Sequence, residues 1–319
     1  MFVGALVGRP VTTCAICASR AESVLCRMTL GPGTEYDLIR CAECGVMFTD
    51  PMPTDAELAA FYGAAYFDFE RDKFEGRGRA FARRYLAGRP RGRFLDVGCA
   101  TGFFLNGVRQ ASGWDVAGVD IGEPAARFAR SELGLDVRQG ELAAAGFAPA
   151  SFSFIHVSNV LEHAREPVAV LRVCRRLLAP GGALYLSIPN GDVDSRDLVT
   201  FFRTEGRPAR SKSGHIFFFP GTTLRRVVAD AGFAIAESHT YGIRRGLRIL
   251  GWYPRSARWK HAYRPVPPPP AAASTEVHVP PGRRHGDWYY RYRFAQAELK
   301  RLPGLLPIGL DFQLLLTPT

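Results

Sequence analysis

The chain has 319 residues, of which 47% are hydrophobic and 22% charged, so it can bury a substantial core and is not a disordered chain. Lysine and arginine outnumber aspartate and glutamate by 41 to 30, and the net charge of +11 favours anionic partners such as nucleic acid, phosphorylated small molecules or a membrane surface. No run approaches the ~20 apolar residues that span a bilayer, and the 7 cysteines do not resemble a secreted disulfide scaffold, so we expect a cytoplasmic protein.

Residues 1–50 contain two Cys-x-x-Cys pairs. The four cysteines of these pairs are Cys14, Cys17, Cys41 and Cys44. Two residues between cysteines let both thiolates reach one ion, and Ala18 and Gly45 supply the small residue that the tight turn needs. Four thiolates complete a tetrahedron, so the spacing predicts a structural zinc site with no open position for catalysis. Two redox-active pairs or unrelated buried thiols are the alternative.

Residues 51–93 are expected to form a helical, basic connector. Pro51 and Pro53 open the segment, and Asp55 suits the cap of a helix that carries Phe61. The second half of the segment is strongly basic, with Arg71, Lys73, Arg77, Arg79, Arg83, Arg84, Arg89, Arg91 and Arg93.

From residue 94 short apolar strands alternate with helices. The expected strands are 94–97, 116–119, 137–138, 152–158, 183–188, 233–236 and 312–316, and the expected helices include 123–133, 166–178 and 222–231. Strands that alternate with helices of this length indicate a parallel sheet built from right-handed crossovers. We therefore assign residues 94–242 and 306–319 to one α/β domain.

A segment of different composition, residues 243–305, interrupts the alternation before the last strand. It contains the aromatic and basic residues Arg244, Arg245, Trp252, Tyr253, Arg255, Arg258, Trp259, Trp288, Tyr289 and Tyr290. Such residues offer broad stacking faces and forked cationic donors for phosphate or carboxylate groups. The segment is expected to be an insertion that binds a ligand, although a dimer interface or a membrane-surface patch would use the same mixture.

The segment Leu95-Asp96-Val97-Gly98-Cys99-Ala100-Thr101-Gly102 leaves a strand and enters a helix. Glycines allow a sharp turn and close approach to a ligand, and the helix directs its free N–H groups to the same place. A dinucleotide fingerprint would need glycine at Ala100 and Phe103. The segment resembles instead the glycine loop of class I S-adenosylmethionine-dependent methyltransferases, an acidic residue followed by Gly-x-Gly-x-Gly, with Ala100 in place of the middle glycine.

Further segments continue this resemblance, in family order, over about residues 94–240. They are Val119-Asp120, Gly140-Glu141-Leu142, Phe152-Ser153, Asn159-Val160-Leu161-Glu162-His163, Pro180-Gly181-Gly182, Gly214-His215-Ile216-Phe217-Phe218-Phe219 and Ala231-Gly232-Phe233. The resemblance implies a Rossmann-like α/β sheet, mostly parallel with an antiparallel last strand, preceded by the small zinc-binding module.

The resemblance also implies S-adenosylmethionine as the cofactor. Asp96 is expected near the methionine ammonium, Asp120 on the ribose diol, where a carboxylate suits a bidentate hydrogen bond, and Glu141 near the adenine amino group. The remaining residues expected at the cofactor are Gly98, Ala100, Gly102, Ile121, Leu142 and Asn159.

Methyl transfer is an in-line displacement on an activated sulfonium, so positioning is the main task of the enzyme. A hydroxyl or acidic carbon acceptor would also need a general base, for which His163 and His215 are the candidates, with Asn159 beside the expected methyl position. His163 could instead hold the start of a helix, and His156 is expected to be a satisfied core residue. Relatives that methylate quinone precursors bind a metal through carboxylates at the positions of Glu162 and Asn159, and Asn159 argues against that metal here.

The cysteine pairs followed by Phe48-Thr49-Asp50-Pro51-Met52-Pro53 resemble the front end of small-molecule methyltransferases. The leading hypothesis is methyl transfer to a small, anionic acceptor, such as a sugar nucleotide, a polysaccharide precursor or a secondary-metabolite intermediate. An RNA methyltransferase is the first alternative, although no Asn-Pro-Pro-Tyr-type tetrapeptide follows the fourth strand. A non-catalytic zinc-ribbon interaction protein is the second. The acceptor atom and the oligomeric state stay open.

Overall fold

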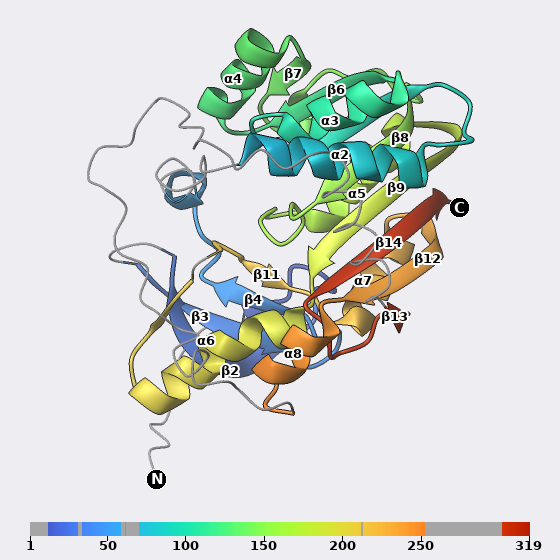
Figure 1. Cartoon of the computed structure of the whole chain (residues 1–319). Helices are drawn as coiled ribbons and strands as arrows, with labels where there is room; N and C mark the ends of the chain where they lie inside the picture. The colour runs from blue at the N-terminus through green and yellow to red at the C-terminus, as the bar shows by residue number, and fades with distance from the viewer. Residues whose placement is uncertain (1–11, 31–33, 59–60, 62–69, 212, 253–301) are drawn as a thin grey trace.

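The computed structural model describes residues 12–30, 34–58, 61, 70–211, 213–252 and 302–319. These residues form two sheets, one of eight strands and one of six (Figure 1). Within this part of the chain, every helix is too short or too polar to cross a membrane.

The larger sheet has the strand order β13-β12-β14-β9-β8-β5-β6-β7. In chain order its strands are β5 (Arg93–Val97), β6 (Asp115–Asp120), β7 (Asp136–Gln139), β8 (Phe152–Ser158), β9 (Leu178–Pro189), β12 (Phe233–Tyr241), β13 (Leu302–Pro303) and β14 (Asp311–Pro318). Strands β5 to β9 pair in parallel, whereas β14 lies antiparallel between β9 and β12. The predicted mixed α/β sheet with an antiparallel last strand is confirmed.

Both faces of this sheet are covered by helices. The covering helices are α2 (Arg71–Tyr85), α3 (Phe103–Ser112), α4 (Glu123–Leu133), α5 (Pro167–Leu177) and α7 (Gly221–Asp230), whereas α6 (Gly191–Glu205) packs on the smaller sheet and on α8 (Ile243–Ile249). Phe94 and Phe154 pack with side chains of α2, α3 and α4, while their neighbours Leu95 and Ile155 belong to the cluster that contains α5 and α7. Because successive strand residues point to opposite faces, burial on both faces explains the continuous apolar runs.

Helix α2, from the basic connector, packs directly on α3 (Figure 1). A Cβ added to Gly78 or Gly107 would lie 2.1 Å from a backbone oxygen of the other helix, so the two glycines permit the close crossing. The Asn106 amide nitrogen also donates to Glu75 Oε1 at 2.8 Å. The connector is therefore helical at residues 55–58 and in α2, while residues 62–69 lie outside the described part.

The smaller sheet combines the N-terminal residues with a later segment. Its strands are β1 (Thr12–Thr13), β2 (Arg20–Thr29), β3 (Glu35–Cys41), β4 (Met47–Asp50), β10 (Ala209–Arg210) and β11 (Phe217–Phe218). Strand β11 pairs antiparallel with β4 and β10 pairs parallel with β2, so the chain between α6 and α7 completes the sheet (Figure 1). Buried residues of this sheet belong to the same core cluster as those of the main domain, and the expected module boundary at residue 50 stays a prediction.

The expected insertion at residues 243–305 begins with α8, and Gly246 of this helix packs closely on the backbone of Ile308. Residues 253–301, which carry most of the aromatic and arginine residues of the insertion, lie outside the described part of the chain.

Candidate functional site

The glycine loop lies between the carboxyl end of β5 and the start of α3. Gly98, Ala100 and Gly102 all have left-handed backbone torsions, with φ of +72°, +46° and +76°. Glycine adopts this region without the steric cost that a side chain brings, which explains the preference for glycine in the loop. Ala100 accepts the same torsion with a side chain, so the departure from the family pattern leaves the turn intact.

Asp120, at the end of β6, organises this loop. The Ala100 backbone N–H donates to Asp120 Oδ2 at 2.7 Å, and the Gly122 N–H donates to Oδ1 at 2.8 Å. Burial raises the pKa of the Asp120 carboxyl, and these two N–H donors oppose the rise. Each carboxylate oxygen can accept about two hydrogen bonds. The carboxylate therefore keeps acceptor capacity for a ligand hydroxyl at each oxygen.

The residues expected around an adenine lie next to Asp120. Ile121, directly after β6, is 57% exposed and so leaves an apolar side chain open to a ligand. The Gly140 N–H donates to the Asp120 carbonyl oxygen at 2.8 Å and so fixes the loop that carries Glu141 and Leu142. Glu141 is exposed, whereas Leu142 is buried. An apolar face and a carboxylate thus border the same edge of the sheet.

Asp96, near the end of β5, is only 4% exposed and its Oδ1 lies 2.7 Å from Nδ1 of His156. His156 is itself 7% exposed. The expected core histidine and the expected methionine-binding carboxylate are therefore direct partners, which the sequence did not indicate.

The turn after β8 contacts the glycine loop. Asn159 is exposed with a left-handed φ of +52°, and its N–H donates to the Ser187 carbonyl oxygen at 3.0 Å. A Cβ added to Gly98 would lie 2.7 Å from Cγ2 of Val160. The segment from Asn159 to His163 therefore lies against the loop where the resemblance places the cofactor.

An acid–base cluster follows this turn. Nδ1 of His215 lies 2.6 Å from Oδ2 of Asp194, on α6, and its Nε2 lies 3.9 Å from Oε1 of Glu162. The Ile216 and Phe217 N–H groups donate to the Glu162 carbonyl oxygen, so β11 holds His215 beside the turn. Glu162 is 1% exposed, and neither of its carboxylate oxygens has a hydrogen-bond partner among the described residues.

The environments of these groups shift their ionisation in opposite directions. Burial raises the pKa of Glu162 to about 8, and the neighbouring His215 opposes this rise. Burial lowers the pKa of His215, but the neighbouring carboxylates, Asp194 first among them, together raise it above its usual value. Burial and the nearby His215 lower the pKa of His163 to about 3. The histidine with the raised pKa is therefore His215, which is hydrogen-bonded to Asp194.

Glu162, His163 and His215 each place one ligating atom within 4.8 Å of the others, so the three could also hold a divalent ion. His163 Nδ1 lies 3.3 Å from the Gly214 carbonyl oxygen, which leaves Nε2 directed toward Glu162 at 4.0 Å. Asn159 is not part of this group.

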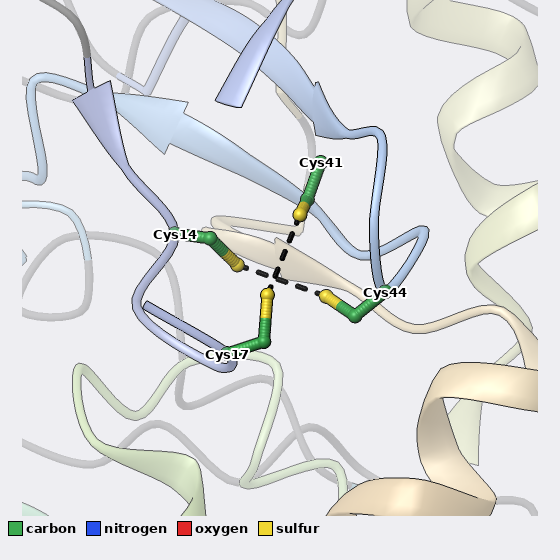
Figure 2. Close-up of side chains that lie close together, drawn as sticks. All are labelled: Cys14, Cys17, Cys41 and Cys44. Carbon is green, nitrogen blue, oxygen red and sulfur yellow. Dashed lines mark hydrogen bonds between the residues drawn. The ribbon is translucent and has the colours of Figure 1, made fainter. Parts of the chain in front are cut away.

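The four cysteines of the N-terminal pairs converge on a common centre (Figure 2). The sulfur atoms of Cys14 and Cys44 lie 3.7 Å apart and those of Cys17 and Cys41 lie 3.6 Å apart. A zinc ion about 2.3 Å from each sulfur requires tetrahedral edges of about 3.8 Å. The four thiols therefore have the spacing of a closed zinc site.

The turns of both cysteine pairs are built alike. The residues after the second cysteines, Ala18 and Gly45, have left-handed φ of +60° and +78°. Their N–H groups donate to the carbonyl oxygens of Cys14 and Cys41 at 2.9 and 3.0 Å. The Thr223 hydroxyl of α7 donates to the Cys44 carbonyl oxygen, so the cysteine cluster is tied to the main domain.

A cavity of about 620 Å³ lies at the other end of the larger sheet. Its lining includes Arg93, Asp115 and Asp136, the first residues of β5, β6 and β7. The glycine loop and the acid–base cluster lie at the carboxyl ends of the strands, where ligands bind in open α/β sheets. We therefore assign the candidate site to the carboxyl edge, although the cavity is at the amino edge.

A family model described as a methyltransferase domain matches residues 66–238, more than half of the chain. The chain belongs to this methyltransferase family. It is a S-adenosylmethionine-dependent methyltransferase. The predicted methyltransferase class and the S-adenosylmethionine part of the cofactor prediction are confirmed, which argues against the non-catalytic interaction protein, whereas the zinc ion stays a prediction.

Curated relatives match a shorter region. The ubiquinone biosynthesis O-methyltransferase of Pseudomonas aeruginosa strain UCBPP-PA14 is 35% identical over 114 residues, which cover 34% of this chain and 47% of the relative. The enzyme of the same name from Ralstonia nicotianae is 36% identical over 108 residues, 32% of this chain and 44% of the relative. The chain thus spans less than half the length of these relatives.

Solved structures are similar over more of the chain at lower identity. A S-adenosylmethionine-dependent methyltransferase from Mesorhizobium loti is 16% identical, with a TM-score of 0.45, over 76% of this chain and 99% of that one. Another from Archaeoglobus fulgidus is 16% identical, with a TM-score of 0.43, over 75% of this chain and 91% of that one.

Proposed function

We propose that the protein methylates a hydroxyl group of a small, anionic acceptor, with His215 as the general base. The observation that carries this proposal is the Asp194–His215 pair with Glu162, two residues after Val160, which contacts Gly98 of the glycine loop. The relatives named O-methyltransferases support an oxygen acceptor. The net charge of +11 supports an anionic one, and we assign additional anion and stacking contacts to the insertion at residues 243–305.

The cofactor is held by the residues around the glycine loop. S-adenosylmethionine, when bound, supplies a methyl group on a positively charged sulfur. Asp120 would accept hydrogen bonds from the ribose hydroxyls, Ile121 and Leu142 would lie at the adenine, and Glu141 would accept from the adenine amino group. Asp96 faces the methionine ammonium. The left-handed loop, the remaining acceptor capacity of Asp120 and the exposed Ile121 fit such a ligand.

His215 accepts the acceptor proton through Nε2. Its Nδ1–H donates to Asp194, because a carboxylate can only accept, and this fixes the tautomer that leaves Nε2 free of hydrogen. Burial raises the pKa of Glu162, which favours its protonated form. Its Oε1 lies 3.9 Å from Nε2, beyond hydrogen-bond distance, so Glu162 does not occupy the base. Asp194 is a positioning residue in this scheme.

The four-cysteine cluster holds a structural zinc ion in this proposal. All four sulfur atoms are within the spacing of a tetrahedral site, and no ligand position is left for a substrate. The ion stabilises the smaller sheet, which packs against the main domain through β11 and α7.

The proposed reaction is tested with methyl-labelled S-adenosylmethionine and three acceptor groups: hydroxylated aromatic acids, nucleotide sugars and transfer RNA. We expect label on an oxygen of a small anionic acceptor, with release of S-adenosylhomocysteine. Label on RNA alone, or on nitrogen or carbon, would contradict the proposed acceptor. Repeating the assay with and without added magnesium or manganese, with the four-cysteine site left loaded, separates acid–base catalysis, which does not depend on the added ion, from a metal held by Glu162, His163 and His215.

Replacing Asp120 by alanine is expected to weaken the binding of S-adenosylhomocysteine roughly 10- to 100-fold, because hydrogen bonds to a charged group contribute ~1.5–3 kcal/mol. Titration calorimetry measures this affinity. Asp115→Ala changes the same residue type at the opposite end of β6 and is the matched control, expected to bind normally. Equal affinity in Asp120→Ala and wild type would remove Asp120 from the site.

A further inference from the structure

Asp96 and His156 are register partners on the adjacent parallel strands β5 and β8. Their side chains lie on the same face of the sheet, and His156 Nδ1 is 2.7 Å from Asp96 Oδ1. Both side chains are buried, with 4% and 7% exposed. Burying a carboxyl group without hydrogen bonds costs free energy, so the hydrogen bond from the imidazole N–H stabilises Asp96 in this position.

The ring of His156 is fixed by aromatic neighbours from three elements. Phe104 of α3 stacks on it with ring centres 4.3 Å apart and an interplanar angle of 19°. Tyr185 of β9 stacks on it at 5.5 Å and 10°, and Phe81 of α2 meets it edge-on at 5.0 Å and 75°. The imidazole therefore cannot swing away, and its Nδ1–H stays directed at Asp96.

We propose that His156 is a positioning residue that fixes Asp96 for recognition of the methionine ammonium of the cofactor. This inference rests on the proposed place of Asp96 in the cofactor site. The imidazole Nδ1–H donates one hydrogen bond to Oδ1 and fixes the carboxylate plane, and Oδ2 is left to accept from an ammonium group.

The position of Asp96 in the chain supports this role. It lies two residues before Gly98, where the backbone turns toward the start of α3. Helix α3 also supplies Phe104, which stacks on His156. The helix that follows the glycine loop therefore fixes His156, and His156 in turn fixes Asp96. A core histidine with a merely structural role would stabilise the sheet equally for every ligand. The positioning role instead predicts a loss confined to ligands that carry the amino group.

The test compares S-adenosylhomocysteine with its deaminated analogue, which keeps the carboxylate and lacks only the amino group. His156→Phe keeps an aromatic ring in the stack and removes the donor. We expect roughly tenfold or weaker binding of S-adenosylhomocysteine and unchanged binding of the deaminated analogue, by calorimetry. His156→Asn, whose amide N–H can replace Nδ1–H, should recover most of the affinity.

A variant that binds both ligands equally weakly would assign His156 a structural role and overturn the inference. Full affinity of His156→Phe for S-adenosylhomocysteine would overturn it as well. His156→Phe combined with Asp96→Asn should weaken binding no further than Asp96→Asn alone, whereas additive losses would show that His156 does not act through Asp96. If wild type binds neither ligand, the proposed cofactor site itself fails, which is a separate outcome.

Discussion

His215→Gln is expected to lower kcat by about 10²–10⁴-fold, the usual contribution of a positioned general base. The affinity for S-adenosylhomocysteine should stay unchanged, because His215 lies outside the glycine loop and beside Glu162. His163→Gln should cost less, since burial lowers the pKa of His163 to about 3 and its Nδ1 is engaged with Gly214. Steady-state kinetics give kcat for both variants, with the acceptor that takes up the methyl label in the assay above. Comparable losses in the two would place the base elsewhere in the cluster.

The pH profile gives a second test of the same base. Asp194 raises the pKa of His215 above its usual value of ~6.5, despite burial, which lowers it. Protonated His215 cannot accept a proton, so kcat of the wild type should fall as the pH drops through this raised pKa. Asp194→Asn removes the negative charge, lowers the pKa of His215 and should shift the acidic limb of the profile to lower pH. If the acidic limb lies at the same pH in the wild type and in Asp194→Asn, His215 is not the general base.

Much of the larger sheet could be predicted from the sequence, because its signals are local. Apolar runs such as Phe152–Ser158 stand between helices with their own stop signals, including the glycines after α3 and α4. The glycine loop was recognisable for the same reason, because its left-handed torsions favour glycine and its residues are close together in the chain. Even Ala100, the one departure, has the left-handed torsion that the pattern requires.

The smaller sheet could be predicted only in part. The four cysteines are visible as two spaced pairs, but β10 and β11 have two residues each and carry no periodic signal. They form strands because β2 and β4 offer open edges that must be hydrogen-bonded or covered. A contact between residues 48 and 217 depends on tertiary packing, which a local pattern does not contain.

The candidate site shows the same division. His163 and His215 were found by their motifs, whereas Asp194 was not, because it stands in an ordinary helical sequence, 21 residues from its partner His215. The pairing of Asp96 with His156 was also missed, since an isolated histidine within an apolar strand resembles any core residue. Strand register alone brings the two side chains together.

Removal of the proposed zinc ion is expected to have the largest effect on stability. Structural zinc contributes ~10–16 kcal/mol to the folding of zinc-finger peptides, so metal-free protein should lose its smaller sheet. That sheet shares buried side chains with the main domain, and Thr223 of α7 bonds to Cys44, so the loss should lower the Tm of the whole protein. Purified protein should carry about one zinc ion per chain, as measured by mass spectrometry of the metal.

Cys41→Ser should abolish this zinc content and lower the Tm, because it removes one of four ligands from a closed site. Cys26→Ala is the matched control, since Cys26 is a buried thiol of the same sheet that lies outside the cluster. It should keep the zinc ion and lose only the stability of one small buried side chain. Any Cys41→Ser protein that remains folded should turn over nearly as fast as wild type, because the cysteines contact neither Asp120 nor His215. Metal-free protein with an unchanged Tm would contradict the zinc site. A folded, zinc-free variant without activity would have a different meaning: the smaller sheet would then shape the acceptor site through β11 and His215.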